Sequence, residues 1–166
     1  IGGKIQNYRN ILRRYIRDYG ENENINRAVQ VLEHAKREAL ATQDKTTLIG
    51  YEGMASNAYF EVLPVLILNQ KADFPFHGRN RRPPKDAVNA MLSFAYTLIA
   101  NDTSAALETV GLDPYVGFLH TLRPGRTSLA LDMMEELRAY LGDRFVLSLI
   151  NKRQITSKDF LFQGDN

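Results

Sequence analysis

The sequence lacks cysteine, long apolar runs and a secretory signal. Without cysteine the chain can form neither a disulfide framework nor a metal site with thiolate ligands. No apolar run approaches the roughly 18 residues that a membrane-spanning helix needs, so no membrane partner is expected. The missing signal segment favours an intracellular, cytoplasmic location.

Length and composition are those of an ordinary globular domain. The chain has 166 residues, of which 44% are hydrophobic and 24% are charged, enough for one domain with a core of its own. The formal net charge of +2 indicates little about partners, because the clustering of positive charge matters more than its sum. The sequence begins with Ile1 rather than methionine, so residues 1–166 are expected to be a single domain from a longer protein.

The remaining pattern is helical almost throughout. Between residues 4 and 19, apolar residues recur at spacings of three and four, with Lys4 and four arginines on the opposite face. Leu40 is placed on the inward face of the second helix, Pro64 should kink or interrupt the third, and 71–85 is a proline-containing loop. Strand-like alternation is scarce, which predicts an all-α domain of short and medium helices. Helices are expected over 4–19, about 24–41, about 46–66, 86–100, about 104–110, 129–140, about 144–152 and from 156, with a brief one leading into His120.

Asp132 and Glu135 are two acids one helical turn apart, in a segment flanked by apolar residues. An acid beside an apolar stripe is costly unless it meets a cation, a hydrogen-bond donor or a metal ion. In the plainer interpretation the helix dipole favours Asp132, while Glu135 is solvated or paired with Arg138. For this stretch taken alone the plainer interpretation is favoured, because amphipathic helices carry such acids routinely.

His120 and Glu52 leave the same kind of choice open. A histidine in an apolar run is more often a core residue bonded to backbone than a metal ligand. Glu52 lies between Gly50 and Gly53, which weaken a helix by about 1 kcal/mol each and are tolerable where a backbone or ligand approaches closely. Either helices pack closely there and Glu52 points outward, or two carboxylates and one imidazole converge on a divalent cation. Such a donor set suits Mn²⁺ or Mg²⁺ bound beside a phosphate.

Basic residues gather in two loops and suggest a phosphate ligand. Guanidinium groups suit phosphate, and neutralised phosphates dominate nucleic-acid affinity, although basic loops are often only soluble surface. Tyr96 is either a core residue or a hydroxyl beside a scissile phosphate. The basic residues singled out are Arg79, Arg81, Arg82 and Lys85 in one loop, and Arg123 and Arg126 in the other.

Several segments occur in an order and spacing that resemble a known family. They are EGMASNAYF, FHGRNRRPPKDAVNAMLSFAYTLI, GLDPYVGFLHTLRPGRTSLALDMMEELR and DRFVLSLINKRQI, after the opening GGKIQNYRNILRRY. Together they resemble the CRISPR-associated Cas1 integrase, a subunit of the spacer-acquisition complex, over essentially all 166 residues. The fine pattern is similar to the subtype I-C branch. Each segment alone is moderate evidence, whereas the ordered set is very specific.

The resemblance implies a site, residue by residue. The family's ligands for Mn²⁺ or Mg²⁺ match Glu52, His120 and Glu135, and its supporting aspartate matches Asp132. Tyr96 matches a tyrosine near the active site, and the basic positions of GRNRRPP match a region close to DNA. A prokaryotic, cytoplasmic setting follows from the same resemblance.

The resemblance also implies an activity and partners. The family inserts double-stranded prespacer DNA into the repeat of a CRISPR array, as antiviral defence, by attack of a 3′-hydroxyl on the repeat strand. Water in place of that hydroxyl gives nuclease activity. An N-terminal β-rich domain builds a homodimer, which forms a heterohexamer with the small Cas2 partner. That β-rich domain is absent from this sequence, so the helical catalytic domain of a two-domain protein is expected. The alternative is a non-catalytic helical module for DNA binding or assembly.

Overall fold

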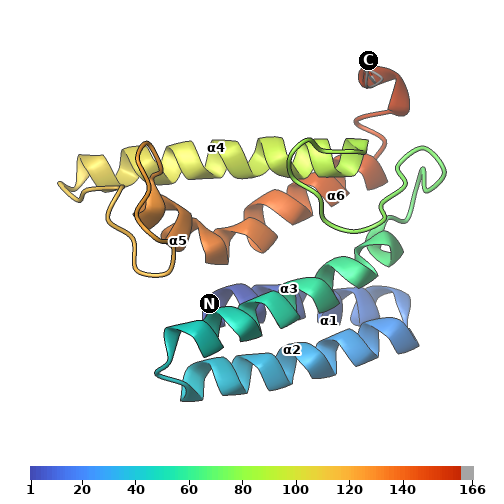
Figure 1. Ribbon diagram of the computed structural model, residues 1–166. Helices are drawn as coiled ribbons and strands as arrows, with labels where there is room; N and C mark the ends of the chain where they lie inside the picture. The colour runs from blue at the N-terminus through green and yellow to red at the C-terminus, as the bar shows by residue number, and fades with distance from the viewer. Residues whose placement is uncertain (162–166) are drawn as a thin grey trace.

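The computed structural model describes residues 1–161, and the regular elements of this part are all helices (Figure 1). No β-strand occurs among residues 1–161, which confirms the expected all-α fold. Within the same residues, every helix is too short or too polar to span a lipid bilayer. The elements are α1 (Gly2–Tyr19), α2 (Glu23–Ala41), α3 (Lys45–Leu66), α4 (Ala87–Thr109), α5 (Ser128–Leu137), the π-helix η1 (Arg138–Asp143), α6 (Arg144–Asn151) and the 3₁₀ helix η2 (Ser157–Asp159).

Side chains cap three helices at their N-termini. Asn22, Asp44 and Asp86 each accept a hydrogen bond from the backbone amide three residues on, at 3.1, 2.7 and 2.8 Å. Such caps satisfy amides that have no carbonyl partner inside the helix. They explain why α2 and α3 begin slightly before the expected positions.

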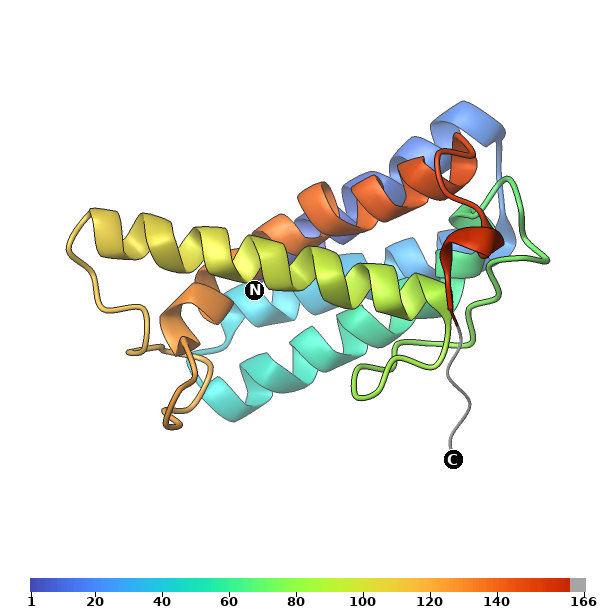
Figure 2. The same ribbon diagram turned by 90° about the horizontal axis from the view of Figure 1, so that it is seen from above.

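The helices form two layers that share one core (Figures 1 and 2). α1, α2 and α3 pack against one another in one layer, and α4 packs on α5 and α6 in the other, while α1 joins the layers by contacting α5 and η1. Tyr8 of α1 and Tyr59 of α3 stack in this core with ring centroids 3.9 Å apart. Leu92, Met134 and Ile150 bring α4, α5 and α6 to the same core, each at most 1% exposed.

Two expectations about the chain between 87 and 120 are wrong. α4 is one continuous helix where two were expected, because the segment around residues 100–104 contains neither glycine nor proline to end it. The brief helix before His120 is absent, and residues 111–127 form turns and loops instead. The amides of residues 118–120 bond to a side chain of α5 rather than to carbonyls of a helical turn.

Smaller corrections concern three other places. Leu40 is 70% exposed, because the buried stripe of α2 continues to Ala39 instead. Pro64 does not interrupt α3, which continues past it and ends at Leu66, and a kink at Pro64 stays a prediction. The helix expected from 156 is the single turn η2, and any continuation beyond 161 lies outside the described residues.

Candidate acid and histidine site

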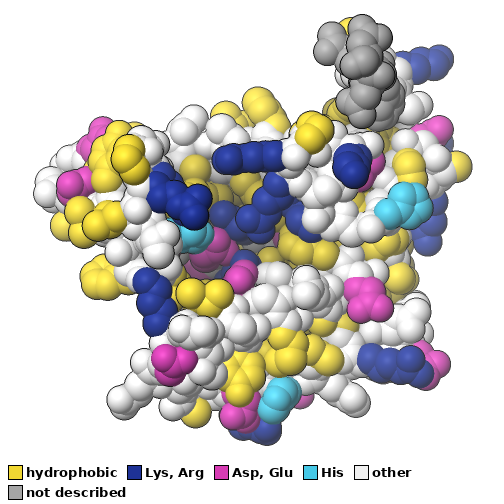
Figure 3. Space-filling model, viewed as in Figure 1, with side chains coloured by type: hydrophobic (Ala, Val, Ile, Leu, Met, Phe, Trp, Pro, Cys, Tyr) yellow, Lys and Arg dark blue, Asp and Glu magenta, His cyan; other side chains and the backbone are white. Residues whose placement is uncertain are grey.

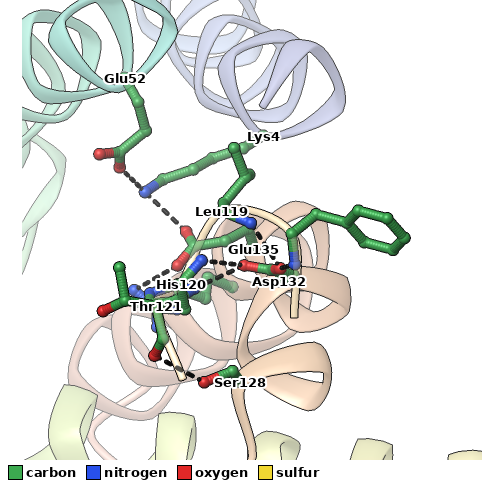
Figure 4. A network of polar contacts seen from close by, with 10 residues as sticks. Lys4, Glu52, Leu119, His120, Thr121, Ser128, Asp132 and Glu135 are labelled. Atoms are coloured by element: carbon green, nitrogen blue, oxygen red, sulfur yellow. Dashed lines mark hydrogen bonds and ion pairs between the residues drawn. The ribbon is translucent and has the colours of Figure 1, made fainter. Parts of the chain in front are cut away.

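His120 lies in the loop that precedes α5, and one carboxylate of α5 holds that loop. Asp132 Oδ2 accepts hydrogen bonds from the backbone amides of Phe118 and Leu119 at 2.6 and 2.8 Å. Its other oxygen, Oδ1, accepts from the amide of His120 at 3.0 Å (Figure 4). Three consecutive backbone amides therefore bond to one carboxylate, which fixes the backbone at His120.

Gly117 allows this loop to lie directly against the start of α5. A Cβ atom at this position would lie 2.7 Å from the carbonyl carbon of Ser128 and 2.9 Å from Asp132 Oδ2, closer than real Cβ contacts. The Ser128 hydroxyl adds a second tether, because it donates to the carbonyl of Thr121 at 3.1 Å. Asp132 and Ser128 of α5 thus hold residues 118–121 of the loop against the helix.

The same carboxylate orients the histidine ring. Asp132 Oδ1 lies 2.6 Å from His120 Nδ1. Burial opposes ionisation of Asp132, but the His120 ring and the three backbone amides outweigh it and lower the pKa of this carboxyl. Because an ionised carboxylate only accepts, Nδ1 carries a proton, and in the neutral ring Nε2 then has the lone pair that a metal ion would use.

Glu52 of α3 and Glu135 of α5 approach each other across a lysine of α1 (Figure 4). The Lys4 ammonium donates to Glu52 Oε1, and its Nζ lies 2.7 Å from Glu135 Oε2. Arg138 completes the group, with Nη1 at 3.1 Å from Glu135 Oε1. Burial opposes the charge on Glu52, but Lys4 and the hydroxyl of Ser56 overcome it and lower the pKa of Glu52. Burial likewise opposes the charge on Lys4, yet its acidic neighbours raise the pKa of this ammonium group above its ordinary value.

Lys4 belongs to this charged group, although the sequence pattern did not single it out. It was expected on the solvent face of the first helix, and that expectation is wrong, because Lys4 is only 2% exposed. The signal that could have revealed it is its register. Lys4 lies four residues before Tyr8 and eight before Leu12, so it belongs to the buried stripe of α1.

Glu52, His120 and Glu135 line one cavity of about 160 Å³. Figure 3 shows acidic side chains and a histidine at a hollow of the surface, with Lys and Arg side chains around it. The structure therefore brings together Glu52, His120 and Glu135, which the sequence singled out, and one of the predicted DNA contacts. The lining residues are Ile1, Ile49, Glu52, Arg81, Leu119, His120, Glu135 and Arg138.

Tyr96 lies in the core beside this cavity rather than in its lining. Its hydroxyl donates to Asp143 of η1, and its ring is 9% exposed. The guanidinium carbons of Arg79 and Arg138 lie 5.3 and 5.0 Å from the ring centroid. Gly142 allows the Tyr96 ring to lie against the backbone of η1, because a Cβ atom at residue 142 would be 2.9 Å from the ring. A contact of Tyr96 with a phosphate stays a prediction.

The predicted basic residues differ in their surroundings. Arg79 is half-buried and donates to Asn89 and Ser93, at 2.8 and 3.1 Å, so it is engaged within the fold. Arg81, Arg82, Lys85 and Arg123 are exposed, and Arg126 is half-buried. Their contacts with DNA stay predictions.

The close helix packing considered for Gly50 and Gly53 is wrong. A Cβ atom added at either glycine meets nothing within 4 Å, so no neighbouring helix requires them. Glu52 instead lines the cavity.

The donors fit a divalent cation in their chemistry. Carboxylate oxygens and an imidazole nitrogen suit Mn²⁺ or Mg²⁺, and the ring of His120 is already oriented by a second carboxylate. Within residues 1–161, however, no three His, Asp or Glu side chains are arranged to hold a metal ion as they stand. The Lys4 ammonium lies between the two glutamates instead.

A helical domain with two carboxylates and one imidazole at a cavity lined by arginines has the ingredients of a phosphate-processing site. The family model described as "CRISPR associated protein Cas1" matches residues 1–165. The chain is 51% identical, over 95% of its length, to the CRISPR-associated endonuclease Cas1 1 of Chlorobaculum tepidum, of which it covers 47%. The chain therefore belongs to the Cas1 family. It spans about half the length of several curated relatives that it matches.

Solved structures agree with this assignment. A Cas6-RT-Cas1–Cas2 complex matches with a TM-score of 0.85 and 28% identity, over 99% of this chain and 17% of the matched chain. A casposase bound to an integration product matches with a TM-score of 0.77 and 27% identity, over 98% of this chain and 44% of the casposase. Subtype I-C stays a prediction.

Proposed function

We propose that this chain supplies the catalytic domain of a metal-dependent DNA integrase and endonuclease that acts in CRISPR adaptation. The observation that carries the proposal is the shared cavity of Glu52, His120 and Glu135, with the histidine ring oriented by Asp132. Two similar structures support it, because one is a casposase bound to an integration product and the other is a complex that contains Cas2.

Each residue of the site has a definite task in this proposal. Glu52, His120 and Glu135 hold Mn²⁺ or Mg²⁺, which when bound supplies Lewis-acid polarisation of a phosphate oxygen. Asp132 keeps the proton on His120 Nδ1 and so keeps Nε2 available. Arg81 lines the cavity as a cation that can contact a phosphate of the DNA.

The reaction exchanges one phosphodiester for another. The 3′-hydroxyl oxygen of a prespacer strand bonds to a phosphorus of the CRISPR repeat, while that phosphorus loses its bond to the neighbouring 3′-oxygen. The hydroxyl proton is released, and the departing 3′-oxygen takes up a proton. The number of phosphodiesters is unchanged, so no ATP is required. Water as the attacking group gives strand cleavage instead.

The proposed integrase would bind DNA, a second copy of itself and Cas2. Exposed Arg81, Arg82, Lys85 and Arg123 would contact double-stranded DNA through its phosphates, with little choice of base sequence. Homodimerisation, and a heterohexamer with Cas2, belong to the intact protein.

A second candidate is a helical module that binds DNA or supports assembly without catalysis. One observation favours it: both candidate carboxylates are paired with Lys4. Glu135 is also paired with Arg138. In that case the intact protein would bind prespacer DNA and Cas2, but the acids would serve only the fold.

Integration separates the two candidates. The intact protein, its Cas2 partner, prespacer DNA and a CRISPR plasmid are incubated with Mn²⁺ or with EDTA. His120→Ala should abolish integration, whereas His34→Ala, an exposed histidine of α2, should retain it. Integration that survives both EDTA and His120→Ala would show that the proposed site is wrong. DNA binding without integration in every reaction would support the assembly module.

A further inference from the structure

Lys4 occupies the place between two carboxylates where a shared cation would lie. Its ammonium donates to Glu52 Oε1, and Nζ lies 2.7 Å from Glu135 Oε2. The three side chains come from three different helices, α1, α3 and α5 (Figure 4). The Lys4 side chain is only 3% exposed, so the solvent does little to weaken these attractions. The ammonium group is thus the link between the glutamates.

The charges of this group already balance. Lys4 and Arg138 carry two positive charges, and Glu52 and Glu135 carry two negative charges. A divalent ion that joined this neutral group without displacement would leave a net charge of +2 in a largely buried place, which is strongly unfavourable. Binding of the ion therefore requires that a resident cation give up its carboxylate contacts. Lys4 is the one that contacts both glutamates.

We infer that Lys4 is the internal cation of this site: it holds Glu52 and Glu135 together while no divalent ion is bound, and it competes with that ion for them. The inference rests on the proposed function, because it assigns the ion to the same two carboxylates. Lys4 is a positioning residue in this scheme, since it acts through the ligands.

The first test measures Mn²⁺ binding without DNA. The intact protein is titrated with Mn²⁺, and free Mn²⁺ is followed by electron paramagnetic resonance. Lys4→Met keeps the length of the side chain and removes its charge, so Mn²⁺ should bind roughly tenfold more tightly. Lys71→Met, an exposed lysine in the turn after α3, removes the same charge elsewhere and should leave the affinity unchanged.

The outcomes separate this inference from the proposed function. Binding that is lost in Glu52→Gln and Glu135→Gln, but is equal or weaker in folded Lys4→Met, leaves the metal site standing and overturns the role of Lys4. If neither the wild type nor Lys4→Met binds Mn²⁺, both the proposed metal site and the role of Lys4 are wrong.

A second measurement needs no variant at Lys4. In protein labelled with ¹⁵N-lysine, the Nζ signal of Lys4 is followed by NMR during a Mg²⁺ titration. The signal should shift or exchange faster with water as the ammonium leaves the glutamates. A Lys4 signal that stays unchanged while Mg²⁺ saturates the site would contradict the inference even if Lys4→Met does not fold.

Discussion

His120 Nδ1 lies 2.6 Å from Asp132 Oδ1, and the same carboxylate accepts the His120 backbone amide at 3.0 Å. Both oxygens of Asp132 thus accept hydrogen bonds from the loop that carries His120. Glu135, one turn further along α5, faces the cavity and its cations. This geometry supports the predicted division of roles, in which Glu135 is a candidate ligand and Asp132 orients the histidine.

Asp132→Asn should impair catalysis more than folding. The amide oxygen can still accept from backbone amides, but the histidine loses the anion that holds its proton on Nδ1. We expect integration to fall roughly 10–100-fold, as for other partners of metal-binding histidines. The integration rate and the imidazole ¹⁵N shifts of His120 check this. Asp102→Asn, on an exposed position of α4, is the control. An Asp132→Asn protein with wild-type rate and unchanged shifts would refute the assigned role.

Glu135→Gln and Glu136→Gln form a matched pair on α5. Glu135 is 5% exposed and contacts Lys4 and Arg138, whereas Glu136 is exposed. Glu135→Gln should lower integration by about 100-fold or more, because it removes a proposed ligand charge, and it should weaken Mn²⁺ binding. Glu136→Gln should behave as the wild type in both measurements. Equal losses in the two variants would mean that the buried position of Glu135 has no special role.

Arg81→Ala and Arg79→Ala should affect different properties. Arg81 is exposed and lines the cavity, so its loss should weaken DNA binding and reduce the slope of log affinity against log salt by about 1. Arg79 packs on Tyr96 and bonds to Asn89, so its loss should lower the free energy of unfolding by roughly 1–3 kcal/mol. DNA binding at varied salt and urea unfolding measure the two effects. A larger salt-slope change in Arg79→Ala would reverse this assignment.

Two glycine substitutions should change stability in opposite directions. Gly117→Ala places a Cβ 2.7 Å from Ser128, which should destabilise the fold by roughly 1–3 kcal/mol and displace the His120 loop. Gly53→Ala meets open space inside a helix and should stabilise the fold by about 1 kcal/mol. Urea unfolding of both variants checks the signs. Destabilisation by Gly53→Ala would show that Gly53 is required by a contact.

Asp143 should make stability fall as the pH rises. Burial raises the pKa of Asp143 from its ordinary value of 3.8 to about 6, although Tyr96 and other neighbours oppose this. The folded chain therefore keeps the proton up to about pH 6, while the unfolded chain releases it near pH 4. The stabilising contribution is full below about pH 4 and is lost as the pH rises through 6.

Asp143→Asn cannot ionise and should remove this loss. Between about pH 4 and pH 7 the free energy of unfolding of the variant should rise by roughly 2 kcal/mol relative to the wild type. Urea unfolding at several pH values measures the difference. Asp73→Asn, at an exposed position, should run parallel to the wild type. Parallel curves for Asp143→Asn as well would mean that Asp143 is ionised throughout.

Local patterns predicted most of the helices but missed two features, the loop before α5 and the burial of Lys4. Apolar spacing and caps are properties of neighbouring residues, so α1, α2, α3 and α6 could be placed within a few positions. The loop at 118–120 could not, because its amides are satisfied by Asp132, more than ten residues away. The burial of Lys4 was visible only in its register with Tyr8, and the usual preference of lysine for solvent hid it.

The sequence by itself determined the helical architecture, the family and the candidate donors, because periodicity and ordered motifs are written along the chain. Only the tertiary structure decided which charged groups meet. Lys4 reaches Glu52, 48 residues away, and Glu135 from a third helix, and no local pattern records a contact between separate helices. Burial then makes that contact consequential, since an ammonium between two carboxylates away from solvent must be displaced before another cation can take its place.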